Sequence, residues 1–221
     1  MRKDVLVLGG TAVVLVAAAL VGATVYRSSQ QKAAPPAAAA GSPAGRSAQL
    51  LVRPHSRAQG PADAKVTVVE FLDPECESCR QMYPLVKQVM AEYQGRARLV
   101  VRYMPFHRNS LFAASALEAA GDQGKYWEML EALFANQPLW GDHHHPRPEL
   151  IPEIAKQVGL DMEAFNKALS NPESKREVEQ DQADGKALGV TGTPTFFVNG
   201  RLLDQLGYEP LKALIEEELR K

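Results

Sequence analysis

The sequence has only two cysteines, Cys76 and Cys79, and both lie in the stretch LDPECESCRQ. A permanent disulfide across so short a loop would constrain the unfolded chain little, so a stabilising crosslink is a poor explanation for the pair. A structural zinc site would need two more ligands, usually a second Cys-x-x-Cys or a spaced pair of histidines. The chain has neither, because His143, His144 and His145 are adjacent. The scarcity of cysteine therefore favours redox chemistry for this pair.

An excess of charge of either sign is also missing. The 25 Lys and Arg balance 26 Asp and Glu, which leaves a formal net charge of −1. This balance provides no basic surplus that would indicate a nucleic-acid partner. With 221 residues, of which 45% are hydrophobic, the chain can build one well-cored domain plus additional segments.

Charge is absent altogether from residues 5–26, VLVLGGTAVVLVAAALVGATVY, which follow Arg2 and Lys3. At about 1.5 Å per residue, a helix of this length would cross a bilayer core of about 30 Å. A cleaved signal peptide with a cut near residues 37–40 is the alternative, although its apolar part is usually only about 7–15 residues long. We expect a transmembrane signal anchor at residues 5–26, with residues 1–4 as a cytoplasmic tip. The flanking charges give only a weak signal for its orientation.

Residues 27–59 are rich in Ala, Pro and Ser and lose the apolar periodicity. This composition predicts a flexible linker with a reach of about 30 Å, stiffened somewhat by Pro35 and Pro36. A helix in the Ala run is the alternative, and neither interpretation provides a second folded domain. We therefore expect the folded domain to cover residues 60–221.

Strand-like and helical stretches alternate from residue 61 onward. The Val-rich residues 65–72 predict a buried strand, residues 80–93 an amphipathic helix, and residues 98–104 a second strand. A right-handed crossover over these short connections makes the two strands parallel. Beyond them, helices are expected at residues 110–123, 126–136, 149–158, 162–169 and 173–188.

Strand character returns near the C-terminus. The Asn199-Gly200 pair between two apolar runs predicts a β-hairpin over residues 193–203. Residues 210–219 then show apolar side chains at helical spacing and predict a final helix. The chain thus combines a βαβ unit, an all-helical block, a β-hairpin and a helix.

The cysteine pair stands where the first predicted strand ends and a helix begins. This is the carboxyl edge of a parallel sheet, where the sites of α/β proteins collect. Free backbone N–H groups and the positive end of the helix dipole favour a thiolate there. Cys76, nearer the strand end, is expected to be the attacking sulfur. Cys79, one turn into the helix and more buried, is expected to resolve the mixed disulfide.

Several motifs resemble the DsbA-like branch of the thioredoxin superfamily in its membrane-tethered bacterial form. VVEFLDPECESC is similar to that family's strand leading into Cys-x-x-Cys, and Pro84 follows the second cysteine by five residues. GVTGTPTFFVNG is similar to its cis-proline segment. The resemblance covers residues 61–221. It implies an α/β thioredoxin fold with an inserted all-helical subdomain at about residues 108–188, preceded here by one N-terminal transmembrane helix and a flexible linker.

The resemblance also implies roles for individual residues. It implies a redox-active disulfide between Cys76 and Cys79, and a cis peptide bond between Thr193 and Pro194 that faces them and holds the substrate chain. An X-Pro bond adopts the cis form at small cost. Glu70 matches a buried acidic residue that assists proton transfer at the resolving thiol. The residues alone also allow a trans proline that opens a strand, and a Glu70 side chain that points outward.

The residues between the cysteines depart from the strongest oxidases of that family. Those proteins have a His directly before the second cysteine, whereas this chain has Ser78, preceded by Glu77. A nearby carboxylate raises the pKa of a thiol, and a less stabilised thiolate makes the disulfide harder to reduce. Glu75 and Glu77 could instead only complement the helix dipole. We predict a Cys76 pKa well above the value of about 3.5 found in the strongest oxidases, and a less oxidising couple.

Histidines supply the remaining candidates. His107 follows the second predicted strand and should lie at the same sheet edge as the cysteines, where it could supply a positive charge or a proton. The loop GDHHHPRP holds His143, His144 and His145, which could bind copper, nickel or zinc weakly. A solvated turn between two helices is the simpler interpretation of this loop.

These features predict an extracytoplasmic thiol–disulfide oxidoreductase in the bacterial inner membrane, with its catalytic domain in the periplasm. It needs no bound cofactor, because electrons pass through the cysteines. The expected partners are cysteine-containing substrate proteins, a membrane redox partner that recharges the pair, and the lipid bilayer. Without a separate dimerisation domain, we expect a monomer. The alternatives are an envelope protein that handles copper or another metal with Cys76, Cys79 and residues 143–145, and an inactive peptide-binding module.

Overall fold

The computed structural model describes residues 43–221, of which Ser47–Lys221 form one compact unit. A five-stranded sheet runs through this unit in the order β1-β3-β2-β4-β5. Strands β2 and β3 are parallel, as the sequence predicts, and every other neighbouring pair is antiparallel. The strands are β1 (Arg57–Gln59), β2 (Val66–Leu72), β3 (Ala97–Tyr103), β4 (Thr195–Val198) and β5 (Arg201–Leu202).

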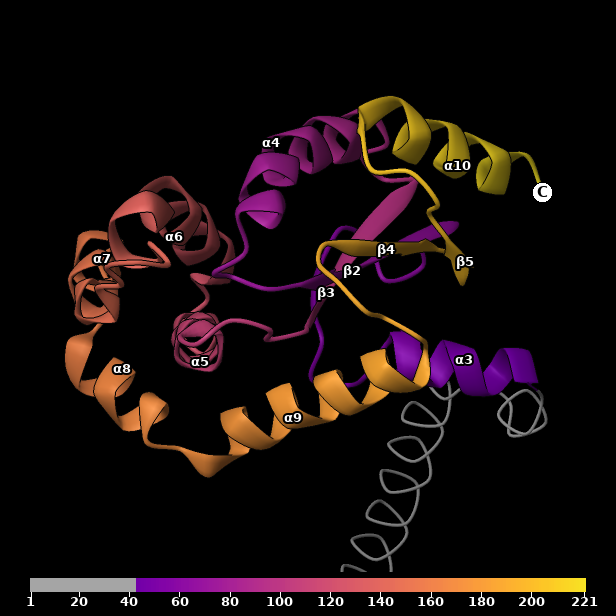
Figure 1. Ribbon diagram of the computed structural model, residues 1–221. Helices are drawn as coiled ribbons and strands as arrows, with labels where there is room; N and C mark the ends of the chain where they lie inside the picture. Colours follow the sequence, from indigo (N-terminus) through magenta and orange to yellow (C-terminus); the bar gives the residue numbers. More distant parts are fainter. Residues whose placement is uncertain (1–42) are drawn as a thin grey trace, which may run out of the picture. The chain divides into compact units, whose positions relative to one another are not determined.

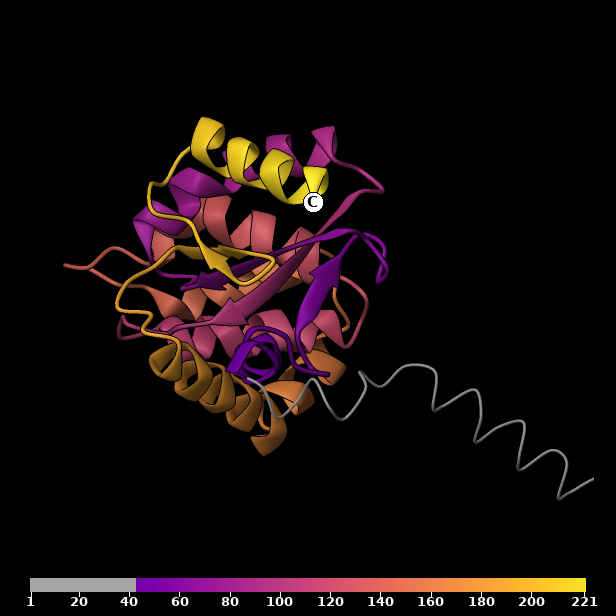
Figure 2. The same cartoon turned by 90° about the vertical axis from the view of Figure 1, so that its right-hand side faces the viewer.

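Helices cover both faces of the sheet. Helices α4 (Glu77–Glu92) and α10 (Tyr208–Arg220) lie on one face, and α9 (Pro172–Ala187) lies on the other with the C-terminal end of α3 (Pro43–Leu51) (Figure 1, Figure 2). Side chains alternate along β2 accordingly. Its even-numbered residues, such as Val66 and Val68, pack in the core under α4 and α10. Its odd-numbered residues, such as Val69 and Phe71, pack against the end of α3.

Together with α9, the remaining helices form the predicted all-helical insertion between β3 and β4. They are α5 (Ser110–Gly121), α6 (Tyr126–Trp140), the short 3-10 helix η2 (Pro148–Leu150), α7 (Ile151–Gln157) and α8 (Met162–Leu169). Figure 1 shows them gathered at one end of the sheet. Their shared core buries large side chains, among them Trp140 and Phe165, and it also takes in Leu72 and both cysteines. The insertion therefore packs directly against the end of β2 where the cysteines stand.

The predicted linker, residues 27–59, extends too far. Residues 43–59 contain α3 and the edge strand β1, which pairs antiparallel with β3. Leu51 is buried against the sheet, and this contact anchors the end of α3. The strand itself, Arg-Ala-Gln, has no apolar alternation by which it could be recognised. The folded domain thus starts before residue 60.

The predictions for residues 1–4, 5–26 and 27–42 concern a part of the chain outside the described residues. Within residues 43–221, none of the helices combines the length and apolar character needed to cross a membrane.

A buried ionic network joins β3 to α9. Arg102 is fully buried, and its Nε lies 2.7 Å from Oδ1 of Asp181 while its Nη2 lies 2.7 Å from Oδ2 of Asp184. The segment after α3 joins the same acids, because Arg53 donates twice to Asp184 and His55 Nε2 lies 2.7 Å from Asp181. A buried charge without partners is strongly destabilising, so these groups have to fold together.

We predict that Asp181→Ala destabilises the protein by about 3–5 kcal/mol, because it removes a buried partner of Arg102 and of the Tyr103 backbone N–H. Urea unfolding measures this loss. The matched control on the same helix is Glu179→Ala, whose exposed carboxylate lies 3.7 Å from Lys175 Nζ and should contribute less than about 1 kcal/mol. Equal losses for the two variants would contradict the prediction.

Candidate active site

The two cysteines occupy different environments at the start of α4. Cys76 is the N-cap residue, with an extended backbone, and Glu77 is the first helical residue. Cys76 retains 8% of its surface exposed, whereas Cys79 is fully buried, and both are free thiols. Cys79 is thus the more buried of the two, as the sequence predicts.

The predicted proline segment faces Cys76. The peptide bond between Thr193 and Pro194 is cis, so the alternative of a trans proline is wrong. The Cys76 Sγ donates a hydrogen bond to the Thr193 carbonyl oxygen at 3.3 Å. This contact joins the N-terminus of α4 to the residue that comes just before β4. The fold thereby brings together two motifs that are 117 residues apart.

Hydrogen bonds make Cys76 the acidic thiol of the pair. The Cys79 side chain contributes most, and with the Thr193 side chain and the backbone N–H groups of Cys79 and Ser78 it lowers the Cys76 pKa from 9.0 to about 5. Burial acts in the opposite direction and is the weaker influence. The value lies above that of the strongest oxidases, about 3.5. Hydrogen bonding at the helix N-terminus, more than neighbouring carboxylates, sets the direction of this shift.

Glu70 and Cys79 are buried, and their pKa values are raised rather than lowered. Burial, followed by the charge of Cys76, raises the Glu70 pKa from 4.5 to about 8. Glu70 is 2% exposed, so the outward-pointing alternative is wrong, and within the described residues its Oε1 has no hydrogen-bond partner. Burial also raises the Cys79 pKa, together with its bond to Cys76 and the charge of Glu70. A protonated carboxyl group and a protonated thiol therefore lie behind the acidic thiol.

Two of the acidic residues around the cysteines are structural. Asp73 is fully buried and accepts hydrogen bonds from the backbone N–H of Glu75 at 2.9 Å and of Phe106 at 2.8 Å. Glu75 is 2% exposed and accepts from the backbone N–H and the side-chain amide of Asn109, at 2.6 and 2.8 Å. Both carboxylates thus fix the loops at the sheet edge. Glu77, by contrast, is half exposed.

His107 does lie at the cysteine edge. Its Nδ1 is 2.7 Å from Oδ2 of Asp73, and its side chain is 29% exposed. Burial lowers the His107 pKa, but the hydrogen bond to Asp73 and the charges of Asp73 and Cys76 outweigh this and raise it. A protonated His107 is therefore favoured beside the Cys76 thiolate.

Gln137 also belongs to the site, although it is not among the residues predicted from the sequence. It comes from α6 in the insertion, is 2% exposed, and its Nε2 donates to the carbonyl oxygens of Pro74 and Cys76 at 2.9 and 3.0 Å. Its Oε1 accepts from Arg80 Nε at 2.9 Å. Gln137 thereby fixes the backbone on which Cys76 stands. No motif surrounds it that could have identified this role.

The histidine loop contributes one residue to the site. His143 lies near Glu77 and His107, whereas His144 and His145 do not belong to this group. Their backbone N–H groups instead donate to Asp142 in a surface turn. In residues 43–221 the candidate metal cluster contains neither cysteine, so the metal-handling alternative lacks the combined site it was based on.

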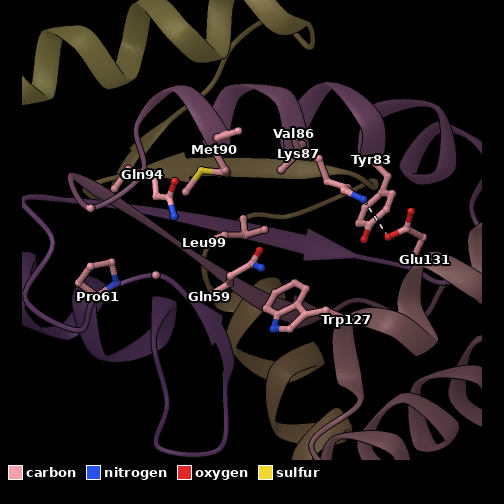
Figure 3. A pocket seen from close by; sticks show the side chains of 14 residues that line it. Gln59, Pro61, Tyr83, Val86, Lys87, Met90, Gln94, Leu99, Trp127 and Glu131 are labelled. Carbon is pink, nitrogen blue, oxygen red and sulfur yellow. Dashed lines mark hydrogen bonds and ion pairs between the residues drawn. The ribbon is translucent and has the colours of Figure 1, made fainter. Parts of the chain in front are cut away.

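A cavity lies away from the cysteines, between α4, β3 and α6. It has a volume of about 590 Å³ and is lined by apolar side chains that include Met90 of α4, Leu99 of β3 and Trp127 of α6 (Figure 3). Lys87 and Glu131 form an ion pair of 2.8 Å in its wall. Neither cysteine lines it, so the cysteine pair lies outside this cavity.

Comparison with known proteins identifies the family and the fold. The sequence model of a family described as thioredoxin matches residues 53–217. The structure is similar to a thioredoxin-like oxidoreductase from Silicibacter pomeroyi, with 29% identity, a TM-score of 0.68, and coverage of 78% of this chain and 98% of that chain. It is also similar to oxidised BdbD from Bacillus subtilis, with 27% identity, a TM-score of 0.68, and coverage of 76% and 94%. Alpha-DsbA1 of Wolbachia pipientis, at 19% identity and a TM-score of 0.71, shares the fold.

Sequence relatives of another kind match only in part. A Na⁺/H⁺ antiporter NhaA from Herminiimonas arsenicoxydans is 39% identical over 145 residues, which cover 66% of this chain and 22% of that protein. The chain spans about a fifth of the length of such relatives. The match therefore concerns one segment of those antiporters.

We predict that thiolate absorbance of the reduced protein titrates with a midpoint of about 5, because only the Cys76 pKa is lowered into this range. Cys79→Ala should raise the midpoint, since it removes the hydrogen bond that lowers this pKa most. Glu77→Gln is the matched control and should shift it less. A midpoint near 3.5, the value of the strongest oxidases, or an equal shift in both variants, would contradict the assignment.

Glu70 should make stability fall with rising pH. Its carboxyl group is protonated in the fold up to about pH 8 but ionises in the unfolded chain near its ordinary value of 4.5. Its favourable contribution is therefore complete below pH 4.5 and is lost by about pH 8, with a slope of about 1.4 kcal/mol per pH unit. Urea unfolding of Glu70→Gln should show a flatter pH dependence over this window. The exposed Glu179→Gln should follow the wild type, and parallel curves for Glu70→Gln would disprove the assignment.

Proposed function

Because this chain belongs to the thioredoxin family, in its DsbA-like branch, we propose that it exchanges disulfides with cysteine-containing proteins through Cys76 and Cys79. It is a protein thiol–disulfide oxidoreductase. The observation that carries the proposal is the difference in pKa and in exposure between the two cysteines. Cys76 has a lowered pKa and reaches the surface beside the cis-proline segment, while Cys79 is buried and has a raised pKa.

The pair would work as an oxidant in two steps. A substrate thiolate attacks Cys76 in the Cys76–Cys79 disulfide, which forms a mixed disulfide and releases Cys79 as a thiolate that takes up a proton. A second substrate thiolate then attacks the substrate sulfur of the mixed disulfide. This step releases the oxidised substrate and the Cys76 thiolate, so two electrons reach the pair. Cys76 is the better leaving group because its thiol has the lower pKa. The reverse sequence reduces a substrate disulfide.

Glu70 is proposed to supply and remove the proton at Cys79. Its carboxyl group is protonated at neutral pH and interacts electrostatically with Cys79 inside the protein. No other carboxyl group influences the Cys79 pKa as strongly among the described residues. Thr193 and Pro194 would hold an extended substrate segment, since the Thr193 carbonyl oxygen already lies within hydrogen-bond distance of Cys76.

We infer a couple less oxidising than that of the strongest oxidases. The Cys76 pKa of about 5 stabilises the thiolate less than a pKa of about 3.5 does, and a less stabilised thiolate makes the disulfide harder to reduce. Ser78 supports this inference, because it places no positive charge between the cysteines. His107, held by Asp73 in the loop after β3, acts in the opposite direction, since a positive charge there would stabilise the Cys76 thiolate.

The proposed location is the outer side of a bacterial inner membrane, with residues 5–26 as a single-pass anchor and the catalytic domain in the periplasm. The uncharged run in the sequence supports the anchor. The match to part of an antiporter also fits a domain that works beside a membrane. We further propose a monomer that is recharged by a membrane redox partner.

We predict that Cys76→Ser abolishes disulfide exchange with a reduced, unfolded test protein, because the variant lacks the attacking sulfur. Cys79→Ala should instead accumulate a mixed disulfide when it is mixed with a disulfide-bonded test protein, because its Cys76 thiolate attacks that disulfide and the resolving thiol is missing. Non-reducing gels of the full-length protein with its substrate measure both outcomes. Ser170→Ala, a substitution on the surface of the insertion, is the control and should act as the wild type does. Full activity in Cys76→Ser would refute the proposed function.

A further inference from the structure

Three side chains from separate segments meet beside Cys76. Glu77 begins α4, His107 lies in the loop after β3, and His143 lies in the loop between α6 and η2. Each offers one ligand atom, and these atoms all lie within 4.8 Å of one another. The geometry points to a site for one divalent transition-metal ion of the zinc type, bound by Glu77, His107 and His143.

The distances suit such an ion. Nε2 of His143 lies 3.4 Å from Oε1 of Glu77, and the rings of His143 and His107 are 5.0 Å apart between centroids. Ligands at about 2.0–2.2 Å from a tetrahedral zinc ion are about 3.3–3.6 Å from one another. Glu77 and His143 are exposed by 50% and 43%, so their side chains can move the remaining distance.

A buried carboxylate orients the third ligand. Nδ1 of His107 lies 2.7 Å from Oδ2 of Asp73, which is fully buried. This contact leaves Nε2 as the free ring nitrogen. A histidine that binds a metal through one nitrogen commonly donates its other N–H to a carboxylate, which fixes the ring and makes it a better ligand. Asp73 therefore prepares His107 for a metal even though the acid itself does not reach it.

The surroundings leave room for the ion and for water. A hollow of about 280 Å³ is lined by Glu77, His143 and His144, and His107 does not line it. Arg80 also lines it, but its Nε is engaged with the Gln137 side chain. Two imidazoles and one carboxylate suit zinc, and three protein ligands leave one position open for water. The site takes only His143 from the histidine loop, whereas the sequence grouped this residue with His144 and His145.

The proposed metal site lies close to the cysteines, but metal binding there does not require their thiols. Glu77 follows Cys76 directly in the chain, and His107 interacts electrostatically with Cys76. A bound cation would thus lie beside the attacking sulfur. The inference goes beyond disulfide exchange and can be tested in a protein that has no thiols.

The test uses the full-length protein with Cys76→Ser and Cys79→Ser, in which metal binding by thiolates is impossible. We expect one Co²⁺ per chain, seen in its visible d–d absorption, and displacement of this Co²⁺ by Zn²⁺. His143→Ala and Glu77→Gln in the same background should each weaken Zn²⁺ binding at least about tenfold. Far-UV circular dichroism should be unchanged, because both side chains are largely exposed.

The neighbouring histidines supply the control. His144→Ala and His145→Ala change the same loop but leave the three ligands in place, and both should bind Zn²⁺ as tightly as the parent. Failure to bind one ion per chain would overturn the proposal. It would equally be overturned if His144→Ala weakened binding as much as His143→Ala, because the metal would then be held by the loop alone. Neither failure would affect the activity of the cysteine pair.

Discussion

The structure around the cysteines depends on one buried carboxylate, that of Asp73. Its oxygens accept the backbone N–H groups of Glu75 and Phe106 and hold Nδ1 of His107. These contacts join the loop after β2 to the loop after β3, which are the two loops that meet at the carboxyl edge of the parallel pair. A fully buried carboxylate is tolerable only when its hydrogen bonds are satisfied, so the two loops take up their positions together. The N-terminus of α4, and with it Cys76, is placed by this arrangement.

In the site built on this arrangement, the charged thiolate lies near the surface and the neutral groups lie deeper. At the surface, hydrogen bonds from Cys79 and backbone N–H groups stabilise a thiolate at Cys76. One layer deeper, burial keeps Cys79 and Glu70 neutral. The two effects depend on each other, because the Cys76 charge raises the Glu70 pKa and the Cys79 thiol lowers that of Cys76. Glu70 keeps its proton at neutral pH because it is an even-numbered residue of β2 and is buried there.

Sequence patterns predicted the elements well where apolar periodicity is strong. The parallel pair of β2 and β3 and the order of the insertion helices follow from it. The strand β1 has three residues without such a pattern, and only its pairing with β3 makes it a strand. The roles of the acidic residues near the cysteines were harder still to predict, because a carboxylate next to a cysteine in sequence can point away from it. Asp73 and Glu75 bind backbone groups of distant loops, and no local spacing encodes those partners.

The helical insertion also contributes side chains to the region around the cysteine pair. Gln137 from α6 donates to the carbonyl oxygens of Pro74 and Cys76, and this contact fixes the backbone at the start of α4. The loop that follows α6 brings His143 to Glu77, on the helix that carries both cysteines. A thioredoxin sheet alone would supply the cysteine pair and the cis proline. The insertion adds an amide that holds the backbone of Cys76 and a histidine beside Glu77, so changes in these helices reach the surroundings of the cysteine pair without touching either sulfur.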